Sequence, residues 1–202
     1  MCGGPRFHVG SDMSLHHLIV GGQRSGKSSQ SERLAQQWLS AAPGREVLVL
    51  ATAVASDEEM HERIRRHRQD RPEAFGTLEV PLALGEAIAE QAAPHRLLLV
   101  DCLTLWLTNV LMPMHALAPA GAPAWPAARS ALLDGLGQAR QQASPVLLIS
   151  NEVGWGVVPI GREVREFVDE LGRLNQDVAL TCDALTLMVA GQAWTRPVEA
   201  RP

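Results

Sequence analysis

The stretch HLIVGGQRSGKS, residues 17–28, decides the fold of this chain. Its apolar run ends at Gly21, and residues 21–28 fit the pattern G-x-x-x-x-G-K-[ST]. Residues 29–40 have the pattern of a helix, so the motif stands between a strand and a helix. In that context the glycines let backbone N–H groups point inward toward phosphate, and the helix N-terminus adds its positive dipole end. The sequence therefore predicts a nucleoside triphosphate site.

The residues expected to bind the phosphates are Gly21, Gly22, Gln23, Arg24, Ser25, Gly26, Lys27 and Ser28. Lys27 is expected to reach the β- and γ-phosphates as a catalytic group, and the Ser28 hydroxyl is expected to hold Mg²⁺. Of the 18 lysines and arginines in the chain, Lys27 is the only lysine. A glycine-rich turn that merely joins strand and helix is the alternative, but a chance match is rare in a chain so poor in lysine.

Length and composition suit one α/β domain, since the chain has 202 residues, 46% hydrophobic and 20% charged. A net charge of −4 offers no basic field for nucleic acid, and no apolar run approaches the roughly 20 residues of a membrane span. Three scattered cysteines argue against a disulfide framework or a zinc site and favour a cytoplasmic protein. We expect a disordered extension at 1–14, the folded domain at 15–195 and a loose tail at 196–202.

Apolar segments alternate with helical patterns along the chain. The expected strands are 18–20, 46–52, 78–80, 96–101, 146–150 and 184–189, and the expected helices are 29–40, 57–70, 84–92, 103–111, 127–142 and 162–178. Such a series predicts an α/β fold like that of P-loop NTPases, with a mostly parallel sheet and helices on both faces. Residues 112–126, rich in Pro and Ala, are expected to form a mobile loop.

Ligands of parallel sheets bind at the carboxyl ends of the strands, so several segment ends are expected to converge on the phosphate loop. Asp101 ends the apolar run at 97–101 and is placed to hold Mg²⁺ directly or through water. The alternative is a strand-terminal Asp that caps the next helix. Convergence at the sheet edge favours the metal role.

A second candidate centre is the helix expected at 57–70, which a capping box at residues 56–59 begins. Met60, Ile64 and His67 share one face of this helix. Four arginines surround the histidine: Arg65, Arg66, Arg68 and Arg71. A neutral imidazole among arginines suits attack on phosphorus, because the ring nitrogen is the nucleophile and the guanidinium groups stabilise charge on the oxygens. The alternative is a half-buried structural histidine, which the spacing alone favours.

Residues 151–159, NEVGWGVVP, follow a strand and contain two glycines and a tryptophan. They either close over a ligand or form a plain connecting loop, and both interpretations stay open. Arg173 and Asn175 are either site groups or the solvated face of a helix. Trp38 and Trp106 are expected in the core.

In this order, the segments resemble the bifunctional adenosylcobinamide kinase/adenosylcobinamide-phosphate guanylyltransferase family of cobalamin biosynthesis. The matching segments are GGQRSGKS (21–28), LATA (50–53), DEEMHERIRRHRQDRP (57–72), LLVDCLTLWLTNVL (98–111), NEVGWGVVP (151–159) and GRLNQ (172–176). The resemblance covers residues 18–191. The H-R-x-x-R-P helix and NEVGWGVVP are far more specific than the phosphate loop, which hundreds of proteins share.

The resemblance implies two reactions. ATP or GTP phosphorylates the aminopropanol hydroxyl of adenosylcobinamide, and a histidine then takes GMP from GTP, expels pyrophosphate, and passes the GMP to the substrate phosphate. By motif position this histidine is His67, and Arg66 stands where some relatives have a second histidine. Thr52, Ala53, Arg71, Glu79 and Asp101 fall where the family contacts the nucleotide, and Arg68 is expected to join them beside His67. The resemblance also implies Mg²⁺, a corrinoid substrate and a homotrimer.

Three other functions compete with this one. A monofunctional P-loop small-molecule kinase would transfer the γ-phosphate without a covalent nucleotide. A regulatory GTP-binding switch is disfavoured because no N-K-x-D motif is present and Asn151-Glu152 does not supply one. A dinucleotide-binding dehydrogenase is excluded because the glycines at 21, 22 and 26 do not form G-x-G-x-x-G.

Overall fold

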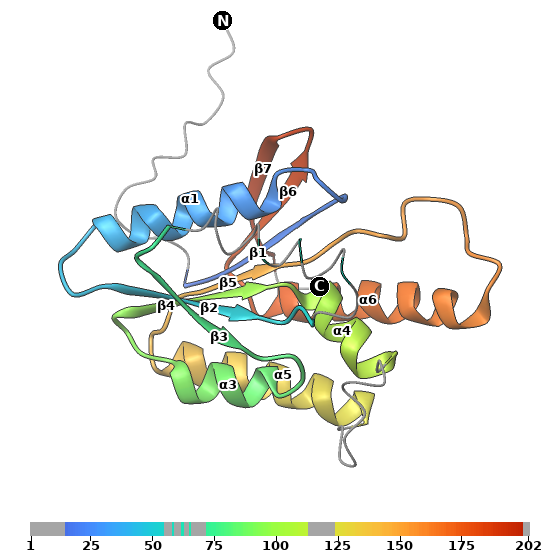
Figure 1. Ribbon diagram of the computed structural model, residues 1–202, viewed down its shortest axis with the longest axis horizontal. Helices are drawn as coiled ribbons and strands as arrows, with labels where there is room; N and C mark the ends of the chain where they lie inside the picture. The colour runs from blue at the N-terminus through green and yellow to red at the C-terminus, as the bar shows by residue number, and fades with distance from the viewer. Residues whose placement is uncertain are drawn as a thin grey trace, which may run out of the picture.

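The protein is described by a computed structural model that covers residues 15–54, 58, 62, 65, 72–112 and 124–199. Within these residues, seven strands form one sheet in the order β3-β2-β4-β5-β1-β6-β7. All neighbouring strands pair in parallel except β6 and β7, which pair antiparallel. Helices lie on both faces of the sheet (Figure 1). The expected α/β fold is confirmed.

The bounds of the elements agree closely with the sequence pattern over most of the chain. The strands are β1 (His16–Gly21), β2 (Glu46–Ala51), β3 (Phe75–Glu79), β4 (Arg96–Asp101), β5 (Val146–Ile149), β6 (Ala184–Val189) and β7 (Gln192–Pro197). The helices are α1 (Lys27–Ser40), α3 (Leu84–Gln91), α4 (Leu103–Leu111), α5 (Trp125–Gln141) and α6 (Arg162–Leu180).

The structure differs from the expected elements at four points. Strand β3 begins at Phe75 rather than at residue 78, and β7 was not expected at all. Because β3 is exposed at every residue after Phe75 and β7 is exposed throughout, neither strand shows an apolar pattern. Strand β7 also runs two residues into the tail expected from 196. Helix α5 begins at Trp125, inside the expected loop 112–126, because Pro126 is tolerated in the first turn of a helix.

The helix expected at 57–70 falls mostly outside the described residues. Glu58, Glu62 and Arg65 are described, and each is helical. Arg65 forms an ion pair with Glu62, with 2.7 Å between guanidinium nitrogen and carboxylate oxygen. Residues 113–123, most of the expected loop, also lie outside the described part of the chain.

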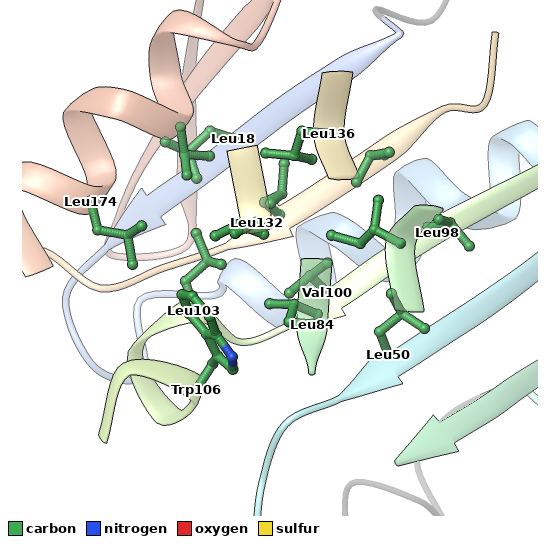
Figure 2. Close-up of a cluster of buried hydrophobic side chains, with 14 of the residues drawn as sticks. Leu18, Leu50, Leu84, Leu98, Val100, Leu103, Trp106, Leu132, Leu136 and Leu174 are labelled. Carbon is green, nitrogen blue, oxygen red and sulfur yellow. The ribbon is translucent and has the colours of Figure 1, made fainter. Parts of the chain in front are cut away.

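The core has two layers because both faces of the sheet are covered. The larger layer lies between the sheet and helices α3, α4, α5 and α6 and contains Leu98 and Val100 (Figure 2). The smaller layer lies under α1 and contains Leu97 and Leu99. Alternate residues of β4 therefore point to opposite faces and are all buried, which explains why the strand reads as a continuous apolar run.

The two tryptophans expected in the core differ in burial. Trp106 is fully buried, and its indole N–H donates to Leu82 O at 2.8 Å. Trp38 is half-buried against the smaller layer, and the Arg45 guanidinium lies 3.6 Å above its ring centroid. The expectation is therefore confirmed fully for Trp106 and partly for Trp38.

Helices α3 and α5 touch backbone to backbone at two glycines. A Cβ added at Gly135 would lie 2.2 Å from Gly85 O, and one added at Gly85 would lie 2.1 Å from Ala131 O. Contacts this short with backbone atoms cannot be relieved by turning a side chain. Any larger residue at either position would have to push the two helices apart.

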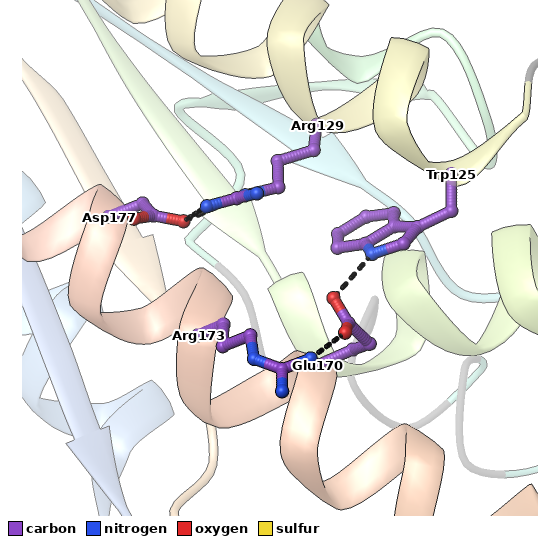
Figure 3. Close-up of polar contacts among 5 residues, drawn as sticks. All are labelled: Trp125, Arg129, Glu170, Arg173 and Asp177. Atoms are coloured by element: carbon purple, nitrogen blue, oxygen red, sulfur yellow. Dashed lines mark hydrogen bonds and ion pairs between the residues drawn. The ribbon is translucent and has the colours of Figure 1, made fainter.

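Polar side chains join α5 to α6 (Figure 3). The Trp125 indole N–H donates to Glu170 Oε2 at 2.7 Å, and Arg173 pairs with the other oxygen of the same carboxylate. Arg129 Nε donates to Asp177 Oδ2 at 2.7 Å. Arg173 is exposed, so of its two interpretations the structure supports the solvated helix face.

Candidate active site

The phosphate loop connects the end of β1 to the start of α1. Gly26 precedes the helix at φ 101°, a left-handed conformation that favours glycine. Gly21 is confined by the neighbouring strand, since a Cβ there would lie 2.4 Å from Met188 O in β6. No described side chain caps the N-terminus of α1. The loop therefore ends at backbone N–H groups that are suited to bind an anion.

The Lys27 side chain folds back over the start of this loop. Its ammonium group donates to Gly21 O at 3.1 Å and to Gly22 O at 2.7 Å. The residue is only 8% exposed. These bonds hold the positive charge at one end of the loop, where a lysine of this motif reaches the β- and γ-phosphates.

Acidic side chains lie at the carboxyl ends of the neighbouring strands. Ala51 of β2 pairs with Glu79 of β3 on one side and with Asp101 of β4 on the other, so the three residues form a row across the sheet. Glu79 is exposed and Asp101 half-buried. Strand β5 separates β4 from β1, which places Asp101 two strands from the phosphate loop.

The pKa of the Cys102 thiol, next to Asp101, depends on its burial and on the charges of Asp101 and Lys27. Burial and the Asp101 charge raise the pKa of the Cys102 thiol to about 11, and the charge of Lys27 acts in the opposite sense. Lys27 and the end of β4 are therefore close enough to interact electrostatically. This thiol stays protonated at neutral pH and does not serve as a nucleophile.

Thr52 is fully buried at the end of β2. Its hydroxyl donates to Cys102 O and accepts from Cys102 N, both at 2.8 Å. Asn109 Nδ2 of α4 donates to Thr52 O at 2.8 Å and to Pro81 O at 3.1 Å. The Thr52 hydroxyl thus shapes the turn after β4, and the half-buried Ala53 follows it. Sequence reasoning missed Asn109, although an amide inside the apolar helix LTLWLTNVL was a signal.

A chain of hydrogen bonds fastens the start of the NEVGWGVVP segment to the site. Asn151 N and Nδ2 both donate to Thr104 Oγ1 at 3.0 Å. Asn175 Nδ2 donates to Asn151 O at 3.0 Å and to Glu152 Oε1 at 3.1 Å. Glu152 N donates to Gly21 O at 3.3 Å. Asn175 is therefore buried beside this segment rather than on a solvated helix face. Thr104 joins the same chain of bonds, and sequence reasoning missed it.

The second candidate centre belongs to the helix expected at 57–70. His67, Arg68 and Arg71 lie outside the described residues. The described part of the site consists of the phosphate loop, the strand ends with Asp101 and Glu79, and the hydrogen-bonded chain through Glu152.

Comparison with known proteins identifies the family. A model of the family described as cobinamide kinase / cobinamide phosphate guanyltransferase matches residues 17–195. The chain belongs to this family. The resemblance read from the sequence is thus confirmed, and the chain is that of a bifunctional cobinamide kinase / cobinamide phosphate guanylyltransferase.

Relatives of the cobinamide kinase / cobinamide phosphate guanyltransferase family match this chain over nearly their whole length. The bifunctional adenosylcobalamin biosynthesis protein CobP of Pseudomonas aeruginosa is 46% identical over 177 residues, which cover 88% of this chain and 94% of the relative. The bifunctional adenosylcobalamin biosynthesis protein CobU of Escherichia coli K12 is 35% identical over 178 residues, which cover 86% and 95%. A solved chain, the P4 protein from bacteriophage phi6 in complex with ADP, aligns with a TM-score of 0.43 at 15% identity, covering 94% of this chain and 57% of its own.

Two side chains of the candidate site offer donors of the kind that a magnesium ion prefers. Ser28 lies at the start of α1 and Asp101 at the end of β4, and both offer the hard oxygen ligands that Mg²⁺ prefers. Within the described residues, no group of three His, Cys, Asp or Glu side chains could hold a metal by itself. No helix in the described part is long and apolar enough to cross a membrane.

Proposed function

We propose that the chain uses its phosphate loop to phosphorylate the aminopropanol hydroxyl of adenosylcobinamide, and that His67 then carries GMP from GTP to the phosphorylated product. Membership of the family supports both reactions. The observation that carries the kinase reaction is Lys27, whose ammonium group is held on the carbonyls of Gly21 and Gly22 at the end of the loop that serves the terminal phosphates. The assignment of His67 rests on its motif position.

The two reactions differ in the phosphorus atom that is attacked. In the first, the acceptor oxygen bonds to the γ-phosphorus, the bond to the β–γ bridging oxygen breaks, and a nucleoside diphosphate leaves. In the second, a His67 ring nitrogen bonds to the α-phosphorus of GTP and pyrophosphate leaves. An oxygen of the substrate phosphate then displaces His67 and yields adenosylcobinamide-GDP. Such a covalent intermediate divides one difficult exchange into two easier steps.

The remaining nucleotide contacts are assigned by motif position. Arg68 and Arg71 are proposed to stabilise charge near the α-phosphate, and Ala53, Glu79 and Asp101 to contact the nucleotide from the strand ends. Thr52 is proposed to act there through its backbone, since its hydroxyl is bonded to Cys102. Ser28 and Asp101 are proposed to hold Mg²⁺, which when bound would offset charge on the phosphates.

A labelling experiment tests the covalent step. Protein incubated with GTP labelled at the α-phosphate should carry label that is stable to base and lost in acid, as expected of a phosphoramidate. The His67→Ala variant should carry none, while it still transfers a γ-phosphate label to adenosylcobinamide. Transfer of the γ-label by wild type without any covalent α-label would instead support the monofunctional kinase. Chelation of Mg²⁺ should abolish both signals.

We also propose a homotrimer in the cytoplasm, by the same resemblance. Apolar side chains before α6 are exposed and would be buried by assembly: Trp155 is 69% exposed, Val157 96% and Ile160 97%. The described cysteines, Cys102 and Cys182, are free thiols, as in a reducing compartment. Light scattering on the purified protein should give three times the chain mass, and replacing Val157 and Ile160 by serine should lower it.

A further inference from the structure

We propose that Glu152 is the catalytic base of the phosphoryl-transfer step, in which it accepts the proton of the acceptor hydroxyl, and that Asn175 is its positioning residue. The inference rests on the proposed function, since it assigns a residue to one of the two reactions. Four observations support it: the anchoring of Glu152, the bond from Asn175, the place of the carboxylate among the strand ends, and the chemistry of the two steps.

The first observation is that Glu152 and Lys27 share one carbonyl. Gly21 O accepts from Lys27 Nζ at 3.1 Å and from the backbone N–H of Glu152 at 3.3 Å. Because the lysine of this motif reaches the β- and γ-phosphates, that carbonyl marks the terminal-phosphate end of the loop. The backbone of Glu152 is therefore fixed beside the phosphate that is transferred, and the α-phosphate lies further along the loop, toward α1.

The second observation is that a buried amide aims the carboxylate. Asn175 is 6% exposed, and its Nδ2 donates to Glu152 Oε1 at 3.1 Å and to Asn151 O at 3.0 Å. Two acceptors on one side fix the orientation of the amide, because a reversed amide would turn its oxygen toward both. Glu152 is half-buried, and within the described residues its Oε2 has no hydrogen-bond partner. One oxygen is therefore held and the other can accept a proton.

The third observation concerns the other acids at this edge of the sheet. Glu79 ends β3, which lies four strands from the phosphate loop in the order β3-β2-β4-β5-β1, and Asp101 ends β4, two strands away. Glu152 follows β5, the strand that pairs directly with β1. Of these three carboxylates, Glu152 therefore lies nearest to the loop, and Asp101 is already assigned to the metal.

The fourth observation is chemical. When the acceptor oxygen bonds to the γ-phosphorus and the nucleoside diphosphate leaves, the hydroxyl proton must also depart, and in our assignment it passes to the Glu152 carboxylate and then to water. Guanylyl transfer has no such proton, because its nucleophiles are a neutral ring nitrogen and then an ionised phosphate. Loss of the base should therefore affect one reaction and spare the other.

The experiment measures both reactions in Glu152→Gln, a variant that keeps the shape and can still accept from Asn175. We expect the kcat for γ-label transfer to adenosylcobinamide to fall by about 10²- to 10⁴-fold, the usual worth of a general base. Labelling by α-labelled GTP, and passage of that label to separately prepared adenosylcobinamide phosphate, should stay within about twofold of wild type.

Two further variants separate catalysis from structure. Glu163→Gln removes a charge from an exposed position in the first turn of α6 and should behave as wild type. Asn175→Ala should lower the kcat of γ-transfer while leaving the KM for the triphosphate and the α-label unchanged. A role confined to holding the fold would lower both reactions together.

Kinase turnover by Glu152→Gln within about twofold of wild type would overturn the proposal, and so would an equal loss of both reactions. Neither result would contradict the proposed function, because the labelling experiment on wild-type protein tests that function separately. If wild type forms no covalent α-label but transfers the γ-label, the assignment of His67 fails, and the base is still tested by γ-transfer alone.

Discussion

Replacing Gly135 by alanine tests the backbone contact between α3 and α5 against a control in the same helix. Gly137 also lies in α5, is exposed, and has nothing within 4 Å of the place where a Cβ would stand. Both substitutions add one methyl group to a helix interior, where alanine is preferred to glycine by about 1 kcal/mol. They differ only in what the methyl group meets.

The expected change in the free energy of unfolding follows from the distances between the added Cβ and the facing backbone. The new Cβ of Gly135→Ala would lie 2.2 Å from Gly85 O and 2.9 Å from Gly85 C. Relief requires the helices to separate by about 1 Å, and overpacking of this kind costs about 1–3 kcal/mol. The rigidity of two backbones points to the upper end, so the net effect after the propensity gain is a loss of about 2 kcal/mol. Gly137→Ala should gain about 1 kcal/mol.

Urea unfolding followed by far-ultraviolet circular dichroism measures both effects. The two variants should differ by about 3 kcal/mol, or by about 6–12 °C in Tm at 2–4 °C per kcal/mol for a chain of this size. Equal stability of the two variants, or a more stable Gly135→Ala, would refute the argument that the helices meet through their backbones.

Two further predictions concern the titration of a buried histidine and the charge in the phosphate loop. Burial lowers the pKa of His17 from 6.5 to about 4, so below pH 6.5 the unfolded chain binds a proton that the folded chain does not. The free energy of unfolding should fall by about 2 kcal/mol between pH 7 and pH 5 on account of this residue. In His17→Gln the free energy of unfolding should fall by about 2 kcal/mol less between pH 7 and pH 5 than in wild type. The matched substitution of the exposed His95 by Gln should leave the fall unchanged. An unchanged fall in His17→Gln would contradict the attribution to His17. Lys27→Met should lower the kcat of γ-transfer by about 10²- to 10³-fold, as loss of one electrostatic donor does in other enzymes, and a smaller loss in a steady-state assay would show that the ammonium group is not needed.

The parts of the fold that the sequence predicts are those with a strong apolar signal. Strands β4 and β6 and helix α4 have the expected bounds because each buries a continuous or periodic set of apolar residues. Strands β3 and β7 carry no such signal, since their backbone pairing is made with side chains that remain exposed. Strand β3 is held by parallel pairing with β2. Strand β7 pairs antiparallel with β6 after the turn at 190–191.

The candidate site also has features that a local sequence pattern predicts and features that it does not. A local motif predicted the loop and Lys27. The rule that the carboxyl ends of parallel strands lie at one edge of a sheet predicted that Asp101 would lie at the same edge as the loop. The bonds among Thr104, Asn175 and Glu152 join elements far apart in the chain. No local pattern encodes such bonds. Only the folded arrangement shows that Asn175 is a buried link and that the Thr52 hydroxyl is already used.

The folded-back side chain of Lys27 allows binding at the phosphate loop to be followed by chemical modification of a single amine. Because it is the only lysine of the 202 residues, its ε-amine is the only side-chain amine in this sequence that amine-directed reagents can modify. Lys27 is 8% exposed, and its ε-amine is hydrogen-bonded to two carbonyls. The rate of acylation at this amine therefore measures how often those hydrogen bonds open. Whole-protein mass spectrometry could then read occupancy of the nucleotide site directly, without any engineered reporter group.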